Sequence, residues 1–396
     1  MSMHPRETFD VVVVGGGPSG ATAASVLARQ GHSVLLLDRA GRIKPCGGAI
    51  PPRLIRDFDI PDELLVARVT SARIVSPKDR HVDMPIDGGF VGMVDRDVFD
   101  EWLRERAAGH GAIRRTGTFQ AFTRDTDGTA VLRYRSKGQE GEVRARAVIG
   151  ADGALSAVAR EAMPDLETVP YVFAYHEIVR SPRQDSRYFD GKRCDVYYRG
   201  ELSPDFYSWI FPHGDTASIG TGSAHKGFSL RNAVGALREC AGLDGLETIR
   251  REGAPIPLRP LSRWDNERDI VLAGDAAGIV APASGEGIYY AMAGGQMSAE
   301  AVGRFLATGN PRELASARKR FMKQHGSVFR VLGMMQRFWY ASDNRRERFV
   351  SICRDRDVQQ LTWDAYMNKE LVRAKPIAHM RIFFKNIAHL TGLARV

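Results

Sequence analysis

The chain has 396 residues, of which 43% are hydrophobic and 26% are charged, with 4 cysteines and a formal net charge of +9. This length allows two or three domains, and the composition is that of an ordinary globular protein. No apolar run approaches the roughly 18 residues of a membrane-spanning helix. The N-terminus has no secretory apolar core, and the cysteines form no C-x-x-C pair. We therefore expect a cytoplasmic protein with no metal site and no disulfide scaffold.

The chain begins with a pattern that is typical of nucleotide binding. Residues 11–14 are all valine and predict a buried strand, and Gly15, Gly17 and Gly20 follow as G-x-G-x-x-G before an alanine-rich helix over 21–30. These glycines allow a tight turn, the approach of backbone N–H groups to phosphates, and close packing of the helix on the strand. A second buried strand over 33–37 ends at Asp38, where an acid suits a ribose hydroxyl.

Periodicity and turn residues predict the next elements in order. A proline- and glycine-rich loop is expected at 44–52, and strands at 69–76 and 80–86. An amphipathic helix is expected over 95–108, with one apolar face formed by Val98, Phe99, Trp102 and Leu103. A meander that returns to the first sheet is predicted at 117–125, 130–135 and 142–149.

The second half of the chain changes from strands to helices. Short strand-like runs between 168 and 260 predict an antiparallel sheet in an inserted domain, with a helix at 229–240. A buried strand over 269–273 resumes the first domain, and helices are expected at 288–307, 311–340 and 345–370. We therefore expect a nucleotide-binding domain in two parts (1–167 and 263–310), a substrate domain (168–262) and a helical C-terminal region (311–396).

The C-terminal region is basic. Residues 311–396 contain 18 Lys and Arg against 7 Asp and Glu, a net charge of +11. Such a region suits nucleic acid, an anionic membrane surface or an anionic substrate, and it is equally consistent with a solvated helical face.

Three glycine–acid turns follow buried strands: the first glycine loop, Gly150-Ala151-Asp152-Gly153, and Gly274-Asp275. Each lies at the carboxyl end of its strand, where open α/β sheets bind ligands. Together they resemble the α/β FAD-binding fold of the aromatic-hydroxylase, glutathione-reductase-like flavoproteins. This resemblance implies FAD as cofactor, with Asp275 at the ribityl chain and pyrophosphate and Arg96 also reaching FAD.

The same resemblance extends to the helix start after Pro282. Gly285-Glu286-Gly287 resembles the stretch over the flavin ring, where N–H groups and a helix dipole would stabilise negative charge on the reduced flavin. There is no second strand–GxGxxG–helix unit, so NADPH is expected to dock transiently. The cofactor-binding residues implied in all are Gly15, Gly17, Pro18, Ser19, Gly20, Asp38, Arg39, Cys46, Gly47, Gly48, Arg96, Asp152, Gly153, Gly274, Asp275, Gly285 and Gly287.

Two further motifs concern the substrate. Residues 204–215 have the form P-x-x-Y-x-W-x-F-P-x-G-D, and alternation places Tyr207, Trp209 and Phe211 on one face of a strand. Such an aromatic wall suits a long apolar substrate, although an ordinary sheet core has the same residue types. The motif resembles the substrate-domain motif of geranylgeranyl reductases. The loop Lys44-Pro45-Cys46-Gly47-Gly48-Ala49-Ile50-Pro51 resembles that of the reductases serving chlorophyll and bacteriochlorophyll synthesis.

This second resemblance implies reduction of isolated C=C bonds in a geranylgeranyl chain, carried as a free diphosphate or as a pigment ester. The flavin would supply hydride, and Cys46 or Tyr207 would be the acid that supplies the proton. Cys46 as a small packing residue and Tyr207 as a core residue are the structural alternatives.

Two other functions remain open at this point. A flavin monooxygenase or halogenase has the same scaffold, and residues 207–212 partly match the halogenase W-x-W-x-I-P stretch, with Lys78 as a conceivable halogenase lysine. A non-enzymatic FAD-binding or membrane-docking protein would use the basic C-terminal helices. Peripheral contact with anionic membrane is suggested by this basic region, by Phe338-Trp339-Tyr340 and by Phe383-Phe384.

Overall fold

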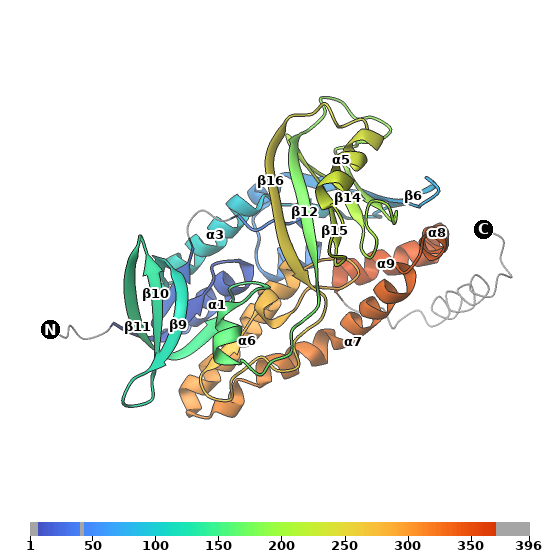
Figure 1. The fold of residues 1–396 in the computed structure, drawn as a ribbon. Coiled ribbons are helices and arrows are strands. Elements are labelled where there is room, and N and C mark those ends of the chain that lie inside the picture. Colours follow the sequence, from blue (N-terminus) through green and yellow to red (C-terminus); the bar gives the residue numbers. More distant parts are fainter. Residues whose placement is uncertain (1–6, 40–42, 370–396) are drawn as a thin grey trace. The chain divides into compact units, whose positions relative to one another are not determined.

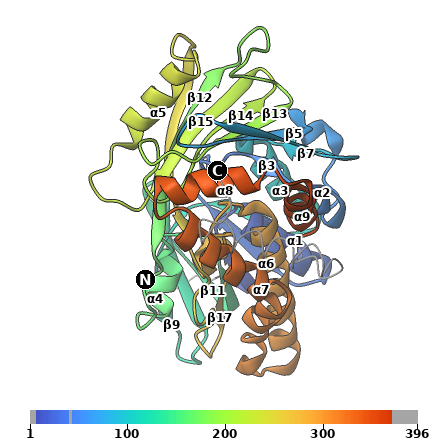
Figure 2. The same cartoon turned by 90° about the vertical axis from the view of Figure 1, so that its right-hand side faces the viewer.

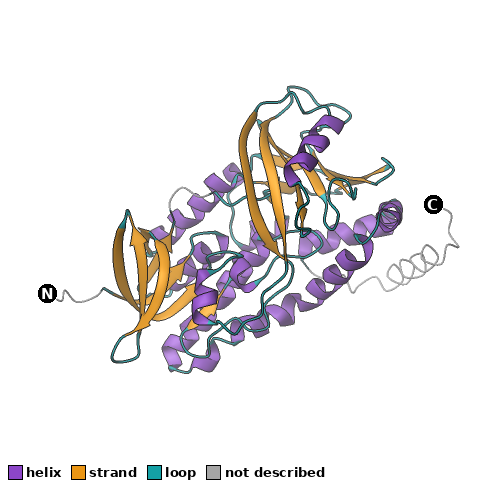
Figure 3. Ribbon diagram, in the orientation of Figure 1, coloured by secondary structure: helices purple, strands orange, loops and turns teal. Residues whose placement is uncertain are grey.

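The computed structural model describes residues 7–39 and 43–369. The chain forms two compact units (Figure 1). Unit 1 consists of Met1–Lys44, Arg96–Tyr171 and Ile256–Gly326, and unit 2 of Pro45–Asp95, Val172–Pro255 and Ser327–Val396. Figure 3 shows that each unit contains both helices and strands. Because each unit has its own sheet and its own core, each is described by itself.

Unit 1 is built on a seven-stranded sheet in the order β8-β2-β1-β11-β10-β9, with β17 paired to β11. Strands β8, β2, β1, β11 and β17 run parallel, whereas β10 and β9 extend β11 as an antiparallel ribbon (Figure 1). The strands are β1 (Thr8–Val14), β2 (Val34–Asp38), β8 (Ile113–Thr116), β9 (Thr118–Arg124), β10 (Ala130–Ser136), β11 (Gln139–Gly150) and β17 (Ile270–Leu272). The predicted first strand, second strand and returning meander are thus confirmed.

Helices pack closely on this sheet. They are α1 (Pro18–Arg29), α3 (Arg96–Gly109), α4 (Ala157–Ala162), α6 (Ile288–Thr308) and the 3₁₀ turns η2 (Gly274–Ala277) and η3 (Pro311–Glu313). Helix α6 approaches α1 so tightly that a Cβ on Gly295 would lie 2.2 Å from the Ser19 carbonyl oxygen. In α3, Phe99 and Leu103 are buried as predicted, but Val98 is 56% exposed. The predicted apolar face was wrong there, because Val98 lies about 100° around the helix from Phe99.

Unit 2 contains a second seven-stranded sheet in the order β16-β12-β15-β14-β13-β5-β6. Its strands are β12 (Tyr171–Arg180), β13 (Arg193–Tyr197), β14 (Ser208–His213), β15 (Thr216–Ser223), β16 (Thr248–Pro257), β5 (Ser71–Val75) and β6 (His81–Pro85). The sequence predicted the antiparallel pairing but not that β5 joins this sheet, parallel to β13. A small sheet of β3 (Ala49–Ile50), β7 (Val91–Met93) and β4 (Ala67–Val69) also belongs to unit 2, as do α2 (Pro52–Asp57) and η1 (Asp62–Leu64).

The two faces of the unit 2 sheet have different environments. Helix α5 (Leu230–Cys240) packs on β15 (Figure 2), and Val234 and Leu237 join Ile210 and Ile219 in one core cluster. Strand alternation sends Trp209 and Phe211 to the opposite face, together with Cys194. On that face Cys194 belongs to a second cluster with Val91 and Met93 of β7, against which Phe211 packs.

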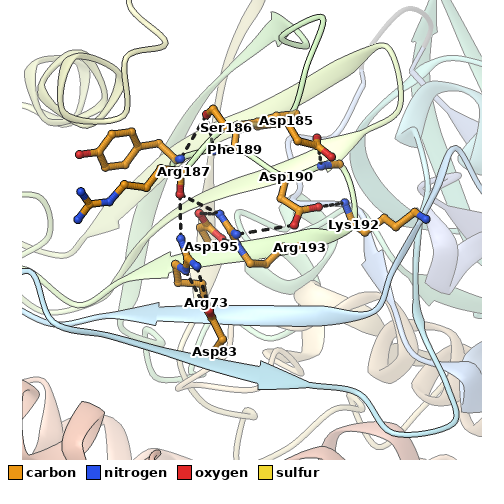
Figure 4. Close-up of polar contacts among 12 residues, drawn as sticks. Arg73, Asp83, Asp185, Ser186, Arg187, Phe189, Asp190, Lys192, Arg193 and Asp195 are labelled. Carbon is orange, nitrogen blue, oxygen red and sulfur yellow. Dashed lines mark hydrogen bonds and ion pairs between the residues drawn. The ribbon is translucent and has the colours of Figure 1, made fainter.

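Two arginines fix the loop that enters β13 (Figure 4). Arg73 donates two hydrogen bonds to Asp83 at 2.6 and 2.9 Å and a third, at 2.8 Å, to the carbonyl oxygen of Arg187. Arg193 is paired in the same two-bond manner with Asp195 and also reaches the Arg187 carbonyl. These charge-assisted bonds tie the loop to both β5 and β13.

The C-terminal helices of unit 2 differ from the prediction. The single helix expected over 345–370 is two helices, α8 (Asp343–Ile352) and α9 (Arg356–Asn368), because Asp355 caps α9 by accepting the Asp357 N–H at 2.9 Å. Helix α7 (Ser316–Trp339) precedes them. None of the described helices is long and apolar enough to cross a membrane.

Candidate functional site

The three predicted glycine–acid turns meet at one edge of the unit 1 sheet. The first follows β1, the second follows β11 and the third follows β17, and these three strands are parallel neighbours. Backbone bonds join them: the Ala151 N–H donates to Val14 at 2.8 Å, and the Ala273 N–H donates to Gly150 at 2.9 Å. The carboxyl ends of the strands therefore form one loop-lined edge, as ligand sites in open α/β sheets do.

The glycines of the first turn have different tasks. Gly15 has φ +106°, and a Cβ there would lie 2.2 Å from the Ala151 carbonyl oxygen. A Cβ on Gly20 would lie 1.8 Å from the Gly15 carbonyl oxygen, so Gly20 allows α1 to pack against the turn. Gly17 is different, because among the described residues a Cβ there would meet nothing within 4 Å. This part of the chain therefore leaves space at Gly17, which is what an incoming phosphate needs.

The start of α1 fits the pyrophosphate of FAD. Gly17 is its N-cap and Pro18 follows, with no side-chain cap and no acidic residue in the first turn. Ser19 is 5% exposed, and among the described residues its Oγ has no hydrogen-bond partner. A buried hydroxyl without a partner is costly, and free N–H groups at a helix N-terminus attract anions. Both features are explained by a phosphate at this position.

The ribose end of the site contains a residue that the sequence did not single out. Asp38 ends β2, and its Oδ2 would lie 2.6 Å from a Cβ on Gly16, so the carboxylate is next to the glycine turn. Arg104 of α3 lies 3.5 Å from Asp38 and donates to the Gly16 carbonyl oxygen at 3.2 Å. The available signal was the spacing of Arg96, Asp100 and Arg104, which places them on one helix face. Arg39 is exposed immediately after β2.

The other predicted cofactor residues of unit 1 already have protein partners. Asp152 accepts hydrogen bonds from Ser156 Oγ at 2.5 Å and from the Ala157 N–H at 2.7 Å, and thereby stabilises the start of α4. Asp275 is 8% exposed and is paired with Lys44, which balances its charge. Arg96 is buried in a two-bond pair with Asp100 at 2.7 and 2.8 Å. The roles of these three residues toward FAD therefore remain predictions.

The glycines beside them provide the turns. Gly153 and Gly274 have φ of +91° and +64°, and Gly285 has φ +64°. Gly287 is the N-cap of α6 with no side-chain cap, which confirms the helix start predicted there.

In unit 2 the structure brings the Cys46 loop and the aromatic motif together. A Cβ on Gly47 would lie 3.0 Å from the Phe211 ring, and a Cβ on Gly48 would lie 2.4 Å from the His213 ring. Both glycines are therefore packed against β14. The Gly48 N–H donates to Cys46 Sγ at 3.4 Å, and the thiol is partly exposed.

The predicted aromatic wall is a continuous row of rings. The centroids of Tyr207 and Trp209 are 6.0 Å apart, and those of Trp209 and Phe211 are 6.2 Å apart. Tyr207 immediately precedes β14, whereas Trp209 and Phe211 lie within it. Burial raises the pKa of Tyr207 above its ordinary range, and the neighbouring Tyr198, Cys46 and Cys194 raise it further. Tyr207 is thus a neutral phenol.

A buried relay orients Trp209. Its indole Nε1–H donates to Ser218 Oγ at 3.0 Å, Ser218 lies 2.9 Å from His176 Nδ1, and His176 Nε2 lies 3.0 Å from Glu252. Indole only donates and carboxylate only accepts, so the Trp209 N–H donates to Ser218 and His176 Nε2 donates to Glu252. Because a Cβ on Gly220 would lie 2.2 Å from the indole, the ring also lies directly over that glycine. Sequence analysis missed this relay, whose members are far apart in the chain.

The start of the aromatic motif is held by α8. Arg346 is 2% exposed, and it donates to the Ser203, Pro204 and Tyr340 carbonyl oxygens. Tyr340 contacts Tyr198, with ring centroids 5.3 Å apart. Trp339 and Tyr340 are only 8% and 4% exposed. Their predicted part in membrane docking is therefore wrong, because they are core residues of unit 2, while Phe383 and Phe384 lie outside the described residues.

Two other features of unit 2 lie away from this arrangement. A cavity of about 160 Å³, lined by Arg73, Arg187 and Tyr197 among others, opens on the opposite face of the sheet from Trp209 and Phe211. Lys78, the conceivable halogenase lysine, is exposed in the turn between β5 and β6. Neither feature belongs to the aromatic row. The described residues contain no group of three or more metal-ligating side chains.

Comparison with known proteins agrees with the features described in each unit. The family described as "FAD binding domain" matches residues 8–320. The chain is 59% identical to a geranylgeranyl diphosphate reductase of Rhodobacter capsulatus over 97% of this chain and 98% of that protein. It is 37% identical to a geranylgeranyl diphosphate reductase of Synechocystis over 96% of this chain and 97% of that protein.

Among solved structures, a geranylgeranyl bacteriochlorophyll reductase-like protein from Thermoplasma acidophilum has the same fold. Its TM-score is 0.80 at 23% identity, covering 94% of this chain and 99% of that one. With the glycine turns, the Cys46 loop and the aromatic row in place, the chain belongs to the geranylgeranyl diphosphate reductase family of FAD-binding proteins.

Proposed function

We propose that this protein is an FAD-dependent oxidoreductase that reduces isolated C=C bonds of a geranylgeranyl chain toward phytyl, with NADPH as the transient reductant. Family membership supports the reaction, and the unit 1 turns support the cofactor. The observation that carries the substrate assignment is the contact of the Cys46 loop with the Tyr207–Trp209–Phe211 row in unit 2. An apolar chain is bound by such a row through buried area and dispersion rather than through hydrogen bonds.

The chemistry divides between cofactor and protein. The hydride for one alkene carbon would come from FAD when this cofactor is bound and reduced. The other alkene carbon needs a proton. An isolated alkene is a poor hydride acceptor, so we expect the hydride and the proton to be delivered together. Cys46 and Tyr207 are our candidates for this acid. The Cys46 thiol lies in the glycine-containing loop that packs against β14. Burial keeps the Tyr207 phenol protonated.

In the same proposal, unit 1 residues bind FAD without taking part in proton transfer. The backbone N–H groups of Gly17, Ser19 and Gly20 hold the pyrophosphate beside Pro18, which has no N–H, and Asp38 binds ribose hydroxyls. Gly47 and Gly48 give the Cys46 loop the backbone conformation that its close contacts require, since Gly48 has φ +70°.

The decisive experiment supplies both forms of the substrate. The purified flavoprotein is mixed with NADPH under nitrogen, and then geranylgeranyl diphosphate or a geranylgeranylated bacteriochlorophyllide is added. We expect successive gains of two hydrogens per reduced bond in the product mass spectrum. Product formation that needs oxygen and leaves the chain unsaturated would instead indicate a monooxygenase or halogenase.

The acid is tested in the same assay. Cys46→Ser is expected to retain bound FAD and lose most alkene reduction, while Cys240→Ser, which removes an exposed thiol, serves as the matched control. A Cys46→Ser enzyme with unchanged turnover would remove Cys46 from the mechanism and leave Tyr207, tested as Tyr207→Phe.

We also propose peripheral contact with anionic membrane. The proposal rests on the net charge of +11 over residues 311–396 and on the lipid-like substrate, and no longer on Trp339 and Tyr340. Co-sedimentation with vesicles that contain anionic lipid should be strong at low salt and weaken as salt is raised. Absence of binding even at low salt would reject it.

A further inference from the structure

His213 connects two parts of unit 2 that the sequence motifs keep separate. It is the last residue of β14 and occupies a position that the aromatic motif leaves unspecified, and its side chain is only 4% exposed. Its Nδ1 lies 3.0 Å from Asp95 Oδ1, and its Nε2 lies 3.1 Å from the Gly47 carbonyl oxygen. The ring is thus held between an acidic side chain and the backbone of the Cys46 loop.

Both partners of the ring are acceptors. A carbonyl oxygen cannot donate, and an ionised carboxylate cannot donate either, so each ring nitrogen must carry a proton to satisfy both contacts. The hydrogen-bond pattern therefore corresponds to an imidazolium, with Asp95 as its counter-ion. A hydrogen bond from a charged donor to a carbonyl is stronger than one between neutral groups.

The Cys46 loop is held at three successive residues. The Gly48 N–H donates to Cys46 Sγ at 3.4 Å, His213 binds the Gly47 carbonyl, and the Val94 N–H donates to the Gly48 carbonyl at 2.9 Å. Two successive glycines have more conformational freedom than any other pair of residues, so a loop of this kind needs such contacts to hold one conformation. Of the three contacts, the one from His213 is the only one made by a side chain outside the loop.

We propose that His213, supported by Asp95, is a positioning residue that fixes the Cys46 thiol for alkene reduction. The inference rests on the proposed role of Cys46 in that reaction. His213 acts through the Gly47 carbonyl and does not itself contact substrate.

The test measures the loop directly, apart from turnover. In a Cys240→Ser background, iodoacetamide reports on Cys46, because Cys194 and Cys353 are buried. His213→Asn leaves an amide near the former Nδ1 and loses the contact with Gly47, whereas His213→Gln places its amide near the former Nε2 and can still donate to Gly47. We expect alkylation of Cys46 to be at least about tenfold faster in His213→Asn, which is the lower end of the effect of losing one charge-assisted bond. In His213→Gln it should stay within about twofold of the parent, given that the retained bond is the one that holds Gly47.

Turnover should change together with the conformation of the Cys46 loop. We expect kcat to fall in His213→Asn with KM for the prenyl substrate and FAD content unchanged, and most of the loss to be recovered in His213→Gln. His81→Asn, which changes an exposed histidine of the same unit, is the control and should alter neither rate. If His213→Asn does not fold, Asp95→Asn removes the counter-ion and should shift both rates in the same direction.

Equal alkylation of Cys46 in parent and His213→Asn would overturn the inference. This result is distinguishable from a failure of the proposed catalytic role. In that second case alkylation still accelerates in His213→Asn, but Cys46→Ser retains full alkene reduction.

Discussion

Replacing Gly17 with alanine separates cofactor binding from protein stability at a single loop. A Cβ at Gly17 would meet no atom of residues 7–39 and 43–369 within 4 Å, and Gly17 has φ −73°, which alanine adopts readily. We therefore expect the apoprotein to keep its stability, apart from the modest cost of alanine at an N-cap, about 0.5–1 kcal/mol. The added methyl group lies where backbone N–H groups would otherwise approach a phosphate.

The expected loss of affinity for FAD follows from the hydrogen bonds that the pyrophosphate would lose. Displacing the pyrophosphate from one N–H removes one hydrogen bond to a charged group, worth about 1.5–3 kcal/mol. At about 1.4 kcal/mol per tenfold change, the Kd for FAD should rise by about 10- to 150-fold. The assay is titration of deflavinated protein with FAD, followed by quenching of flavin fluorescence, beside a thermal melt of the same apoprotein.

Gly20→Ala provides the contrasting variant. Its Cβ would lie 1.8 Å from the Gly15 carbonyl oxygen, so the backbone must move. We expect destabilisation of about 1–3 kcal/mol or more in the apoprotein itself, seen as a lower Tm. Gly109→Ala, at the end of α3 with no atom of the described residues within 4 Å, is the matched control and should leave the Kd for FAD unchanged without lowering the Tm. A Gly17→Ala protein that binds FAD with parental affinity would refute the placement of the phosphate at this loop.

Two further predictions concern unit 2. Ser218→Ala removes the acceptor of the Trp209 indole N–H and should lower the free energy of unfolding by about 1–3 kcal/mol. In a Trp209→Phe background, where there is no N–H to satisfy, urea titrations should show a smaller cost, and equal costs in both backgrounds would argue against the relay. Burial raises the pKa values of Tyr198, Tyr207 and Tyr340, so above a pH of about 10 the unfolded phenols lose protons that the folded ones retain. Stability should therefore fall as pH rises through that range, less steeply in Tyr340→Phe, and an unfolding midpoint that does not change between pH 9 and 10.5 would contradict this prediction.

Some elements were determined by local sequence. The run of valines over 11–14, the glycine spacing and Asp38 specify a strand, a turn and a second strand through short-range sterics and burial, and the structure has them where they were predicted. The aromatic motif likewise specifies its own alternation on β14. Val98 and the break between α8 and α9 were mispredicted, because a periodic pattern fixes neither the edge of an apolar stripe nor a cap such as Asp355.

Contacts between distant segments were decided by tertiary structure alone. β5 joins the second sheet beside β13, His213 reaches Gly47 across 166 positions, and Arg104 reaches Gly16 across 88. Trp339 and Tyr340 were expected at a membrane surface and are core residues instead. The sequence by itself determined the cofactor class and the family, because their motifs are local. The turns require glycine for their backbone conformation, and the strand motif consists of aromatic residues in alternation. Which side chains hold those motifs in place depends on long-range packing, because spacing can place residues on one face of a helix, as for Arg104, but does not say which distant backbone that face contacts.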